Sequence, residues 1–266
     1  MLSVLSHSNI KVIQHNHFKL FFKVVLGQKN IIDNNLFQEG IISIQDPAAG
    51  AVVDLINPQK NDFILDVCAA PGTKSLSMAQ RVGQGGRIFA CDNSQMRIDK
   101  AIKDKPRHRL NNIEWHLLDA SKDKYPLHEK ILLDVPCSGT ATTRKNRELW
   151  NNWTPKVGRS MFKLQSDIAY RAAQLLRPGG DMVYSTCSLD PIENEAVVCD
   201  ILNRCPWLEL KYIDTEQLLP GFICHRGTNN WQILDEKGST VEFTGEIPKL
   251  PGLSEYMLSP LQRGLD

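Results

Sequence analysis

From residue 61 onward, short apolar runs alternate with amphipathic stretches, and this alternation constrains the fold more than any other feature of the chain. The pattern is typical of a mostly parallel sheet whose crossover connections are helices that cover both faces. A chain of 266 residues with 42% hydrophobic residues is long enough to bury the core of one large domain. We therefore predict an α/β fold. Its strands are expected at residues 63–67, 87–91, 113–118, 131–135 and 182–185.

Helix and turn signals divide the remainder of the chain. The clearest helix is expected from Gln165 to Leu176, ended by the turn Arg177-Pro178-Gly179-Gly180. Residues 40–56 are expected to form a short strand, a turn and then a helix. Beyond about residue 208 the periodicity fades and turn residues increase. The prediction is an N-terminal accessory segment at 1–38, a main domain at 39–208 and a C-terminal tail of that domain at 209–266.

Composition gives weaker guidance about partners and location. A formal net charge of +1 means that any RNA or DNA surface would have to be a local patch. Seven cysteines without Cys-x-x-Cys spacing disfavour a disulfide framework and a zinc module, so we expect reduced thiols and no metal. No apolar run approaches the roughly 20 residues of a membrane span. We expect a cytoplasmic or nuclear location.

The N-terminal 32 residues are a weaker indication of a mitochondrial location. They contain four lysines and no acidic residue, a bias found in organellar transit peptides. They also lack arginine, which favours an accessory segment.

Two cysteines each follow an apolar run that reads as a buried strand. Cys137 lies in the motif Asp-Val-Pro-Cys-Ser-Gly at 134–139, and Cys187 lies in Tyr-Ser-Thr-Cys-Ser at 184–188. Both thiols should emerge at strand ends, which suggests a two-thiol active site. A lone cysteine is more commonly a small buried apolar side chain, and we keep that interpretation for the other five.

Acidic residues end four of the predicted strands, and ligands of open α/β sheets bind outside the carboxyl ends of strands. They are Asp66, Asp92, Asp119 and Asp134. Asp92 could bind ribose hydroxyls and Asp119 an adenine amine. Helix capping would explain any one of them, but four in register favour a cofactor site. The loop at 68–74, where Pro71-Gly72 allows close backbone approach, would hold an amino-acid-bearing nucleoside.

A dinucleotide cofactor is the weaker interpretation of this site. It would require Gly-x-Gly-x-x-Gly directly after the first strand, and that pattern is absent there. The glycines at 83–86 precede the second strand and read as a turn.

Four motifs in one order resemble the RNA (cytosine-5) methyltransferases of the NOP/Sun/RsmB type. They are Gln45-Asp46-Pro47-Ala48, the loop Asp-Val-Cys-Ala-Ala-Pro-Gly-Thr-Lys at 66–74, and the two cysteine motifs; the match covers residues 39–205. The resemblance implies a Rossmann-like methyltransferase fold, S-adenosylmethionine as cofactor, RNA as partner and 5-methylcytosine as product. Segments at 144–146 and 191–198 are most similar to the eukaryotic tRNA-modifying branch, with the bacterial ribosomal-RNA branch second.

The resemblance also implies residue roles. Cys187 would be the nucleophile that adds to carbon 6 of cytosine, which makes carbon 5 reactive. Cys137 would assist product release, and Asp134 would stabilise charge on the pyrimidine. RNA would be bound by Lys74, Arg144, Lys145 and Asn146, with Trp150 and Trp153 nearby to stack a base. The cofactor would be contacted by Cys68, Ala69, Ala70, Pro71, Gly72, Thr73, Lys74, Asp92, Asp119 and Asp134.

Departures from the family pattern leave two alternatives. Thr73 and the stretch 140–143 replace residues that are usually smaller or glycine-rich, and the family's closing strand with its Gly-Phe-Phe signature is not found, so we expect a shortened tail. One alternative is a non-catalytic RNA-binding or assembly factor on the same fold, against which the two retained thiols argue. The other is a DNA cytosine-5 methyltransferase, in which Cys137 would form the covalent bond; Thr186-Cys187 indicates the RNA family instead.

Overall fold

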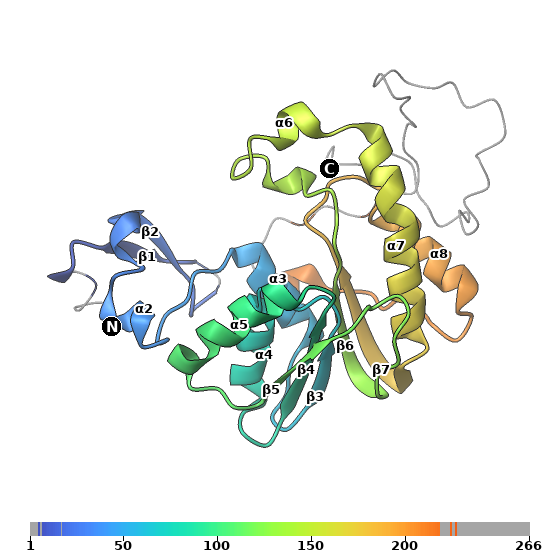
Figure 1. The fold of residues 1–266 in the computed structure, drawn as a ribbon, viewed down its shortest axis with the longest axis horizontal. Coiled ribbons are helices and arrows are strands. Elements are labelled where there is room, and N and C mark those ends of the chain that lie inside the picture. Colours follow the sequence, from blue (N-terminus) through green and yellow to red (C-terminus); the bar gives the residue numbers. More distant parts are fainter. Residues whose placement is uncertain (1–4, 6, 17, 219–223, 225–226, 228–266) are drawn as a thin grey trace. The chain divides into compact units, whose positions relative to one another are not determined.

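A computed structural model describes residues 5, 7–16, 18–218, 224 and 227 (Figure 1). The described chain divides into two compact units. Unit 1 comprises the described residues up to Ile64, Ala69–Leu117 and those from Ile213 to Leu218; unit 2 comprises Leu65–Cys68, Leu118–Tyr212 and Cys224 with Gly227. Five strands are hydrogen-bonded in the order β5 (Ile113–Leu117), β4 (Arg87–Asp92), β3 (Phe63–Asp66), β6 (His128–Asp134) and β7 (Leu176–Ser185), which confirms the predicted α/β fold. Most of the predicted C-terminal tail lies outside the described residues.

The N-terminal part of unit 1 is a hairpin followed by short helices. Strand β1 (Lys11–Gln14) pairs antiparallel with β2 (Phe22–Leu26), and η1 (Gln28–Asn30) and α2 (Asn35–Gln38) follow. The hairpin packs on a small cluster of Leu5, Ile10 and Ile31. These elements occupy the segment that the sequence indicated only as accessory.

The strand expected within residues 40–44 is absent, and this prediction was wrong. These residues form turns and bends. The side chain of Arg107 donates hydrogen bonds to the carbonyl oxygens of Phe37 (2.8 Å) and Ile42 (3.3 Å), so those acceptors are satisfied without a neighbouring strand. The helix predicted after them is confirmed as α3 (Pro47–Ile56), and the Asp46 side chain caps it by accepting from the Ala48 N–H at 3.0 Å.

The α/β part of unit 1 is built on two parallel strands. Strand β4 (Arg87–Asp92) pairs with β5 (Ile113–Leu117), and helices α4 (Thr73–Val82) and α5 (Gln95–His108) pack against them (Figure 1). Strand β3 (Phe63–Asp66) is divided between the two units. Apolar side chains fill the space between helices and strands, which is why the strands read as continuous apolar runs. The fully buried ones include Ile64, Met78, Ala79, Val82, Ile88 and Ala90.

Unit 2 is built on a second parallel pair. Strand β6 (His128–Asp134) pairs with β7 (Leu176–Ser185), helix α7 (Pro155–Ala173) packs on both strands, and α8 (Glu195–Arg204) packs on α7 (Figure 1). Three consecutive residues of β6, Ile131, Leu132 and Leu133, are fully buried. The short elements of the chain are η2 (Thr140–Thr142), α6 (Leu149–Asn152) and, in unit 1, α9 (Thr215–Leu218).

The helix predicted from Gln165 to Leu176 is longer at its start and shorter at its end. It begins at Pro155 and ends at Ala173, and Leu176 is already the first residue of β7. The predicted turn at 177–180 lies inside that strand. His128 pairs with Leu176 whereas Lys130 pairs with Asp181, so the four residues form a bulge opposite one residue of β6. A bulge accommodates Pro178, which has no N–H to donate, and Gly179, whose φ is +78°.

Candidate active site

The two cysteine motifs are brought together by the register of β6 and β7 in unit 2. Asp134 pairs with Ser185, so Cys137 lies three residues beyond one strand and Cys187 two residues beyond its parallel neighbour. The two Sγ atoms are 3.2 Å apart, and the Cys187 N–H donates to Cys137 Sγ at 3.3 Å. The Ala141 N–H also donates to the Cys187 carbonyl at 3.0 Å. Parallel strands in register therefore convert two distant motifs into one thiol pair.

The two thiols differ in exposure and in acidity. Cys187 is exposed, whereas Cys137 is half-buried. The pKa of Cys137 is raised well above its ordinary value, first by its hydrogen bond with Cys187 and then by burial. Cys137 therefore keeps its proton and can donate it in a hydrogen bond to Cys187 Sγ. This arrangement favours Cys187 as the thiol that becomes a nucleophilic thiolate.

Asp134 is the last residue of β6, three residues before Cys137. Its carboxylate is half-buried and accepts a hydrogen bond from Ser185 Oγ at 2.9 Å. Ser185, which pairs with Asp134 in the sheet, thus orients the Asp134 carboxylate. The resemblance assigned this carboxylate to the pyrimidine edge.

Unit 1 contains most of the predicted cofactor loop. Gly72 has φ +99° and precedes the first turn of α4, and a Cβ at this position would lie 3.0 Å from Trp115 Cη2. Ala69 anchors the loop by donating its N–H to the Cys91 carbonyl at 2.9 Å. Only glycine combines this backbone conformation with this close approach, as the Pro71-Gly72 pair indicated.

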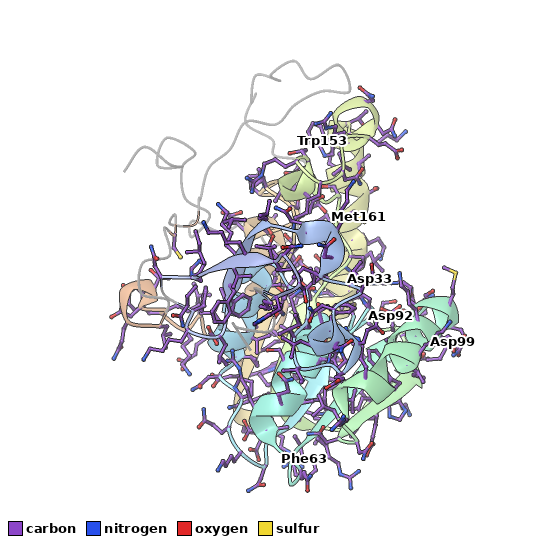
Figure 2. All side chains as sticks on the ribbon, turned by 90° about the vertical axis from the view of Figure 1, so that its left-hand side faces the viewer. Asp33, Phe63, Asp92, Asp99, Trp153 and Met161 are labelled. Carbon is purple, nitrogen blue, oxygen red and sulfur yellow. The ribbon has the colours of Figure 1, made fainter. Side chains whose placement is uncertain are left out.

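Asp92 fastens this loop to the end of β4. The residue, labelled in Figure 2, is 2% exposed. Its carboxylate accepts from the Ala70 N–H (3.2 Å) and the Ser94 N–H (3.1 Å). It also forms an ion pair with Arg97 at 3.1 Å, and Arg97 in turn donates to the Ala70 carbonyl. Arg97 was missed by sequence reasoning. The available signal was a basic residue five positions after a strand-end acid, in the first part of a helix.

Asp119, in unit 2, lies two residues beyond the end of β5. Its carboxylate accepts from the Ser121 hydroxyl (2.6 Å) and N–H (2.9 Å) and pairs with Lys122 at 3.2 Å. The hydrogen bonds from Ser121, followed by the effect of Lys122, lower the pKa of Asp119. The carboxylate is therefore ionised and held by its own turn, a different setting from that of Asp92.

The predicted RNA-binding residues fall in both units. Arg144, Lys145 and Asn146 are exposed between η2 and α6 in unit 2, whereas Lys74 is half-buried in the first turn of α4 in unit 1. Trp153, which follows α6 and is labelled in Figure 2, is half-buried, and its indole nitrogen is buried. The side chain of Trp150 lies outside the described residues.

Sequence reasoning missed a set of buried polar side chains that are hydrogen-bonded to the two cysteine loops or belong to them. Ser138 and Ser188 each directly follow one of the two cysteines, and both are 8% exposed; Gln165 and Glu193 are fully buried. The signal for the serines was their position next to the cysteines. Glu193 belongs to a segment that the resemblance covered, but its charge gave no sign of burial.

Two negative findings hold for the residues that the structure describes. Among them, no group of three histidine, cysteine, aspartate or glutamate side chains is arranged to hold a metal ion. No helix in this part of the chain is long and apolar enough to cross a membrane.

Comparison with known proteins identifies a family that the chain matches. Residues 53–226 match the family described as 16S rRNA methyltransferase RsmB/F. A probable ribosomal RNA small subunit methyltransferase B from Synechocystis is 38% identical over 61% of this chain and 37% of its own length. A multisite-specific tRNA:(cytosine-C(5))-methyltransferase from Saccharomyces cerevisiae is 31% identical over 74% of this chain and 31% of its own length. The chain thus spans well under half of these relatives.

Solved structures agree with the fold. The crystal structure of NSun6 from Pyrococcus horikoshii with SFG has a TM-score of 0.61 and 30% identity, covering 66% of this chain and 47% of that one. A methyltransferase homologue from the same organism has a TM-score of 0.63 and 27% identity over 73% of this chain and 62% of its own. These similarities confirm the Rossmann-like methyltransferase fold and the predicted family.

Proposed function

Because the chain belongs to the RsmB/F family of methyltransferases, we propose that it methylates carbon 5 of cytosine in RNA. The observation that carries this proposal is the pair of thiols at 3.2 Å, in which Cys187 is exposed and Cys137 is half-buried with a raised pKa. Relatives named for tRNA and for ribosomal RNA both support RNA as the substrate class. We place tRNA ahead of ribosomal RNA because the segments at 144–146 and 191–198 are most similar to the tRNA branch.

We propose S-adenosylmethionine as the methyl donor, and the residues of the predicted site fit it. Gly72 leaves no side chain at the start of α4, and Asp92 is a strand-end carboxylate held in place by three donors. The resemblance assigns residues 68–74, Asp92, Asp119 and Asp134 to the cofactor; of these, residues 69–74 and Asp92 belong to unit 1 and would hold it there. When bound, it would supply a methyl group on a sulfonium sulfur. The related structure with SFG, a molecule of the same nucleoside class, supports this choice.

The first step that we propose is attack by the thiolate of Cys187 on carbon 6 of the cytosine. As the S–C6 bond forms, the electrons of the C5–C6 double bond move onto carbon 5 and its conjugated ring neighbours. The resulting enamine makes carbon 5 a nucleophile able to take a methyl group. Asp134, oriented by Ser185, would stabilise the charge that develops on the pyrimidine edge. Cys137 starts as a hydrogen-bond donor to the attacking sulfur.

Release requires loss of the proton from carbon 5 and cleavage of the S–C bond. The electrons of the C5–H bond re-form the C5–C6 double bond, and Cys187 leaves as a thiolate. Once Cys187 is bonded to the base, the hydrogen bond that most raises the pKa of Cys137 is lost. Cys137 can then lose its own proton to water and, as a thiolate, accept the carbon-5 proton, directly or through water.

An adduct assay tests the proposal. Cys137→Ala protein mixed with S-adenosylmethionine and total RNA is expected to give a denaturation-resistant protein–RNA band, because the adduct forms but is not released. The Cys137→Ala,Cys187→Ala variant is the control and should give no band. Sequencing the trapped RNA separates tRNA from ribosomal RNA.

The two alternatives give different results in the same assay. A DNA-type mechanism predicts an adduct in Cys187→Ala that requires Cys137. A non-catalytic RNA-binding or assembly factor predicts RNA binding without a covalent band and without 5-methylcytosine, and this result would overturn the proposal.

A further inference from the structure

A fully buried carboxylate joins the two cysteine loops of unit 2. Glu193 is 0% exposed and lies in the turn before α8. Its Oε2 accepts from the Ser138 N–H (2.7 Å) and from the Gln165 side-chain amide (3.1 Å). Its Oε1 accepts from the Ser188 hydroxyl (2.7 Å) and from the Ser138 hydroxyl. Four donors therefore converge on one carboxylate.

Three of these donors belong to the two loops that carry the cysteines. Ser138 is the neighbour of Cys137, and Ser188 is the neighbour of Cys187. Gln165 also donates to the Pro136 carbonyl at 2.9 Å, so it ties α7 to the same loop. A single carboxylate thus binds the residue next to each thiol.

The chemistry of the site favours a carboxylate over any other side chain at this position. Removing a charge from water is costly unless hydrogen bonds replace the lost hydration. An ionised carboxylate accepts only and has lone pairs for all four donors. A neutral amide of the same shape would have to turn its NH₂ group toward two of them. A glutamine at this position could therefore not accept from all four donors, three of which belong to the two cysteine loops.

We propose that Glu193 is a positioning residue that sets the separation of Cys137 Sγ and Cys187 Sγ. Its hydrogen bonds go to Ser138, Ser188 and Gln165, and it acts on the thiols through the two serines. Its value for methyl transfer rests on the proposed function, but its effect on thiol geometry does not. A test on the thiols alone therefore separates failure of one proposal from failure of the other.

The test is the rate of disulfide formation between the two thiols in the full chain, without RNA or cofactor. The azo oxidant diamide takes up the two thiol hydrogens as the S–S bond forms, and peptide mapping by mass spectrometry identifies the Cys137–Cys187 link. Because reaction rate depends steeply on the placement of the reacting atoms, we expect Glu193→Gln to slow this link by about ten-fold or more. The Cys137→Ala variant identifies background from other cysteines.

Asp200→Asn is the matched control for loss of a buried acid. Asp200 is 3% exposed and pairs with Arg204 at 3.1 Å on α8, without a hydrogen bond to either cysteine loop among those described. We expect it to form the link at the wild-type rate even if its melting temperature falls. A link formed at the wild-type rate by folded Glu193→Gln would overturn the proposal.

Two further readouts keep the proposal testable. If Glu193→Gln does not fold, Ser188→Ala removes one hydroxyl donor and leaves the carboxylate; a slower link supports the proposal and an unchanged rate overturns it. In a methylation assay, folded Glu193→Gln should lower kcat while KM for S-adenosylmethionine stays unchanged. If the wild type methylates no RNA but Glu193→Gln still slows the link, the positioning role stands and the proposed reaction falls.

Discussion

At the scale of single residues, the two thiols depend on one another. The hydrogen bond with Cys187 is the largest cause of the raised pKa of Cys137, so replacing Cys187 by alanine should lower that pKa toward its ordinary value. A raised pKa keeps the thiol protonated to a higher pH, and only the thiolate reacts with iodoacetamide. We therefore expect Cys137 in Cys187→Ala to be alkylated several-fold faster at pH 8 than in the wild type, measured by peptide mass spectrometry.

The control for this prediction is Cys205, whose pKa is raised mainly by burial and which lies on no cysteine loop. Its alkylation rate should be the same in both proteins. A Cys137 that reacts at an equal or slower rate in Cys187→Ala would contradict the assigned direction of the hydrogen bond.

Residue-scale features were predictable where the sequence encodes them locally. Gly72 and the two cysteines stand in motifs that specify a conformation or a strand end, and the structure places them accordingly. Glu193 and Arg97 were not predictable, because nothing local distinguishes a buried or clamping charge from a solvated one. Ser138, a partner of Glu193, and Ala70, a partner of Arg97, come from other segments that only the fold brings near.

At the scale of elements, the parallel pair β6–β7 sets the geometry of the thiols. Substitutions of its buried side chains should therefore lower the free energy of unfolding most. Leu132 is fully buried on β6, and Leu132→Ala removes apolar contacts and leaves a cavity. We expect the free energy of unfolding to fall by about 2–5 kcal/mol. Leu127→Ala, at a leucine that is 55% exposed, should change it by less than about 0.5 kcal/mol. Urea denaturation measures both, and equal losses would contradict the assignment of the core.

The strands were predictable because buried parallel strands appear as uninterrupted apolar runs. The boundaries of β7 were not, because Arg177-Pro178-Gly179-Gly180 has the composition of a turn and is retained in the strand only by pairing on both sides of a bulge. The strand expected near Ile42 failed for the opposite reason, since its apolar pattern is present but a side chain, Arg107, takes the carbonyl.

At the scale of the whole molecule, the formal net charge of +1 leaves RNA affinity to local patches. The α/β fold followed from the alternation of apolar runs and amphipathic stretches, and the family from the order of the motifs. The target RNA did not follow, because it depends on RNA shape and unpaired bases that no motif in this chain encodes. The basic residues next to the cysteine motif are the patch that the proposed function requires.

This requirement leads to a prediction about salt dependence. Arg144 and Lys145 are exposed and follow the Cys137 loop. If each neutralises one phosphate of a single-stranded target, Arg144→Ala,Lys145→Ala should weaken binding and reduce the slope of log K against log salt by about 1 to 1.5. Filter binding of tRNA over a salt series measures the slope.

The matched control is Lys100→Ala,Lys103→Ala on α5, two exposed lysines outside the predicted site, which should leave the slope unchanged. An equal reduction in both variants would mean that RNA responds to total charge, and the patch would lose its assigned role.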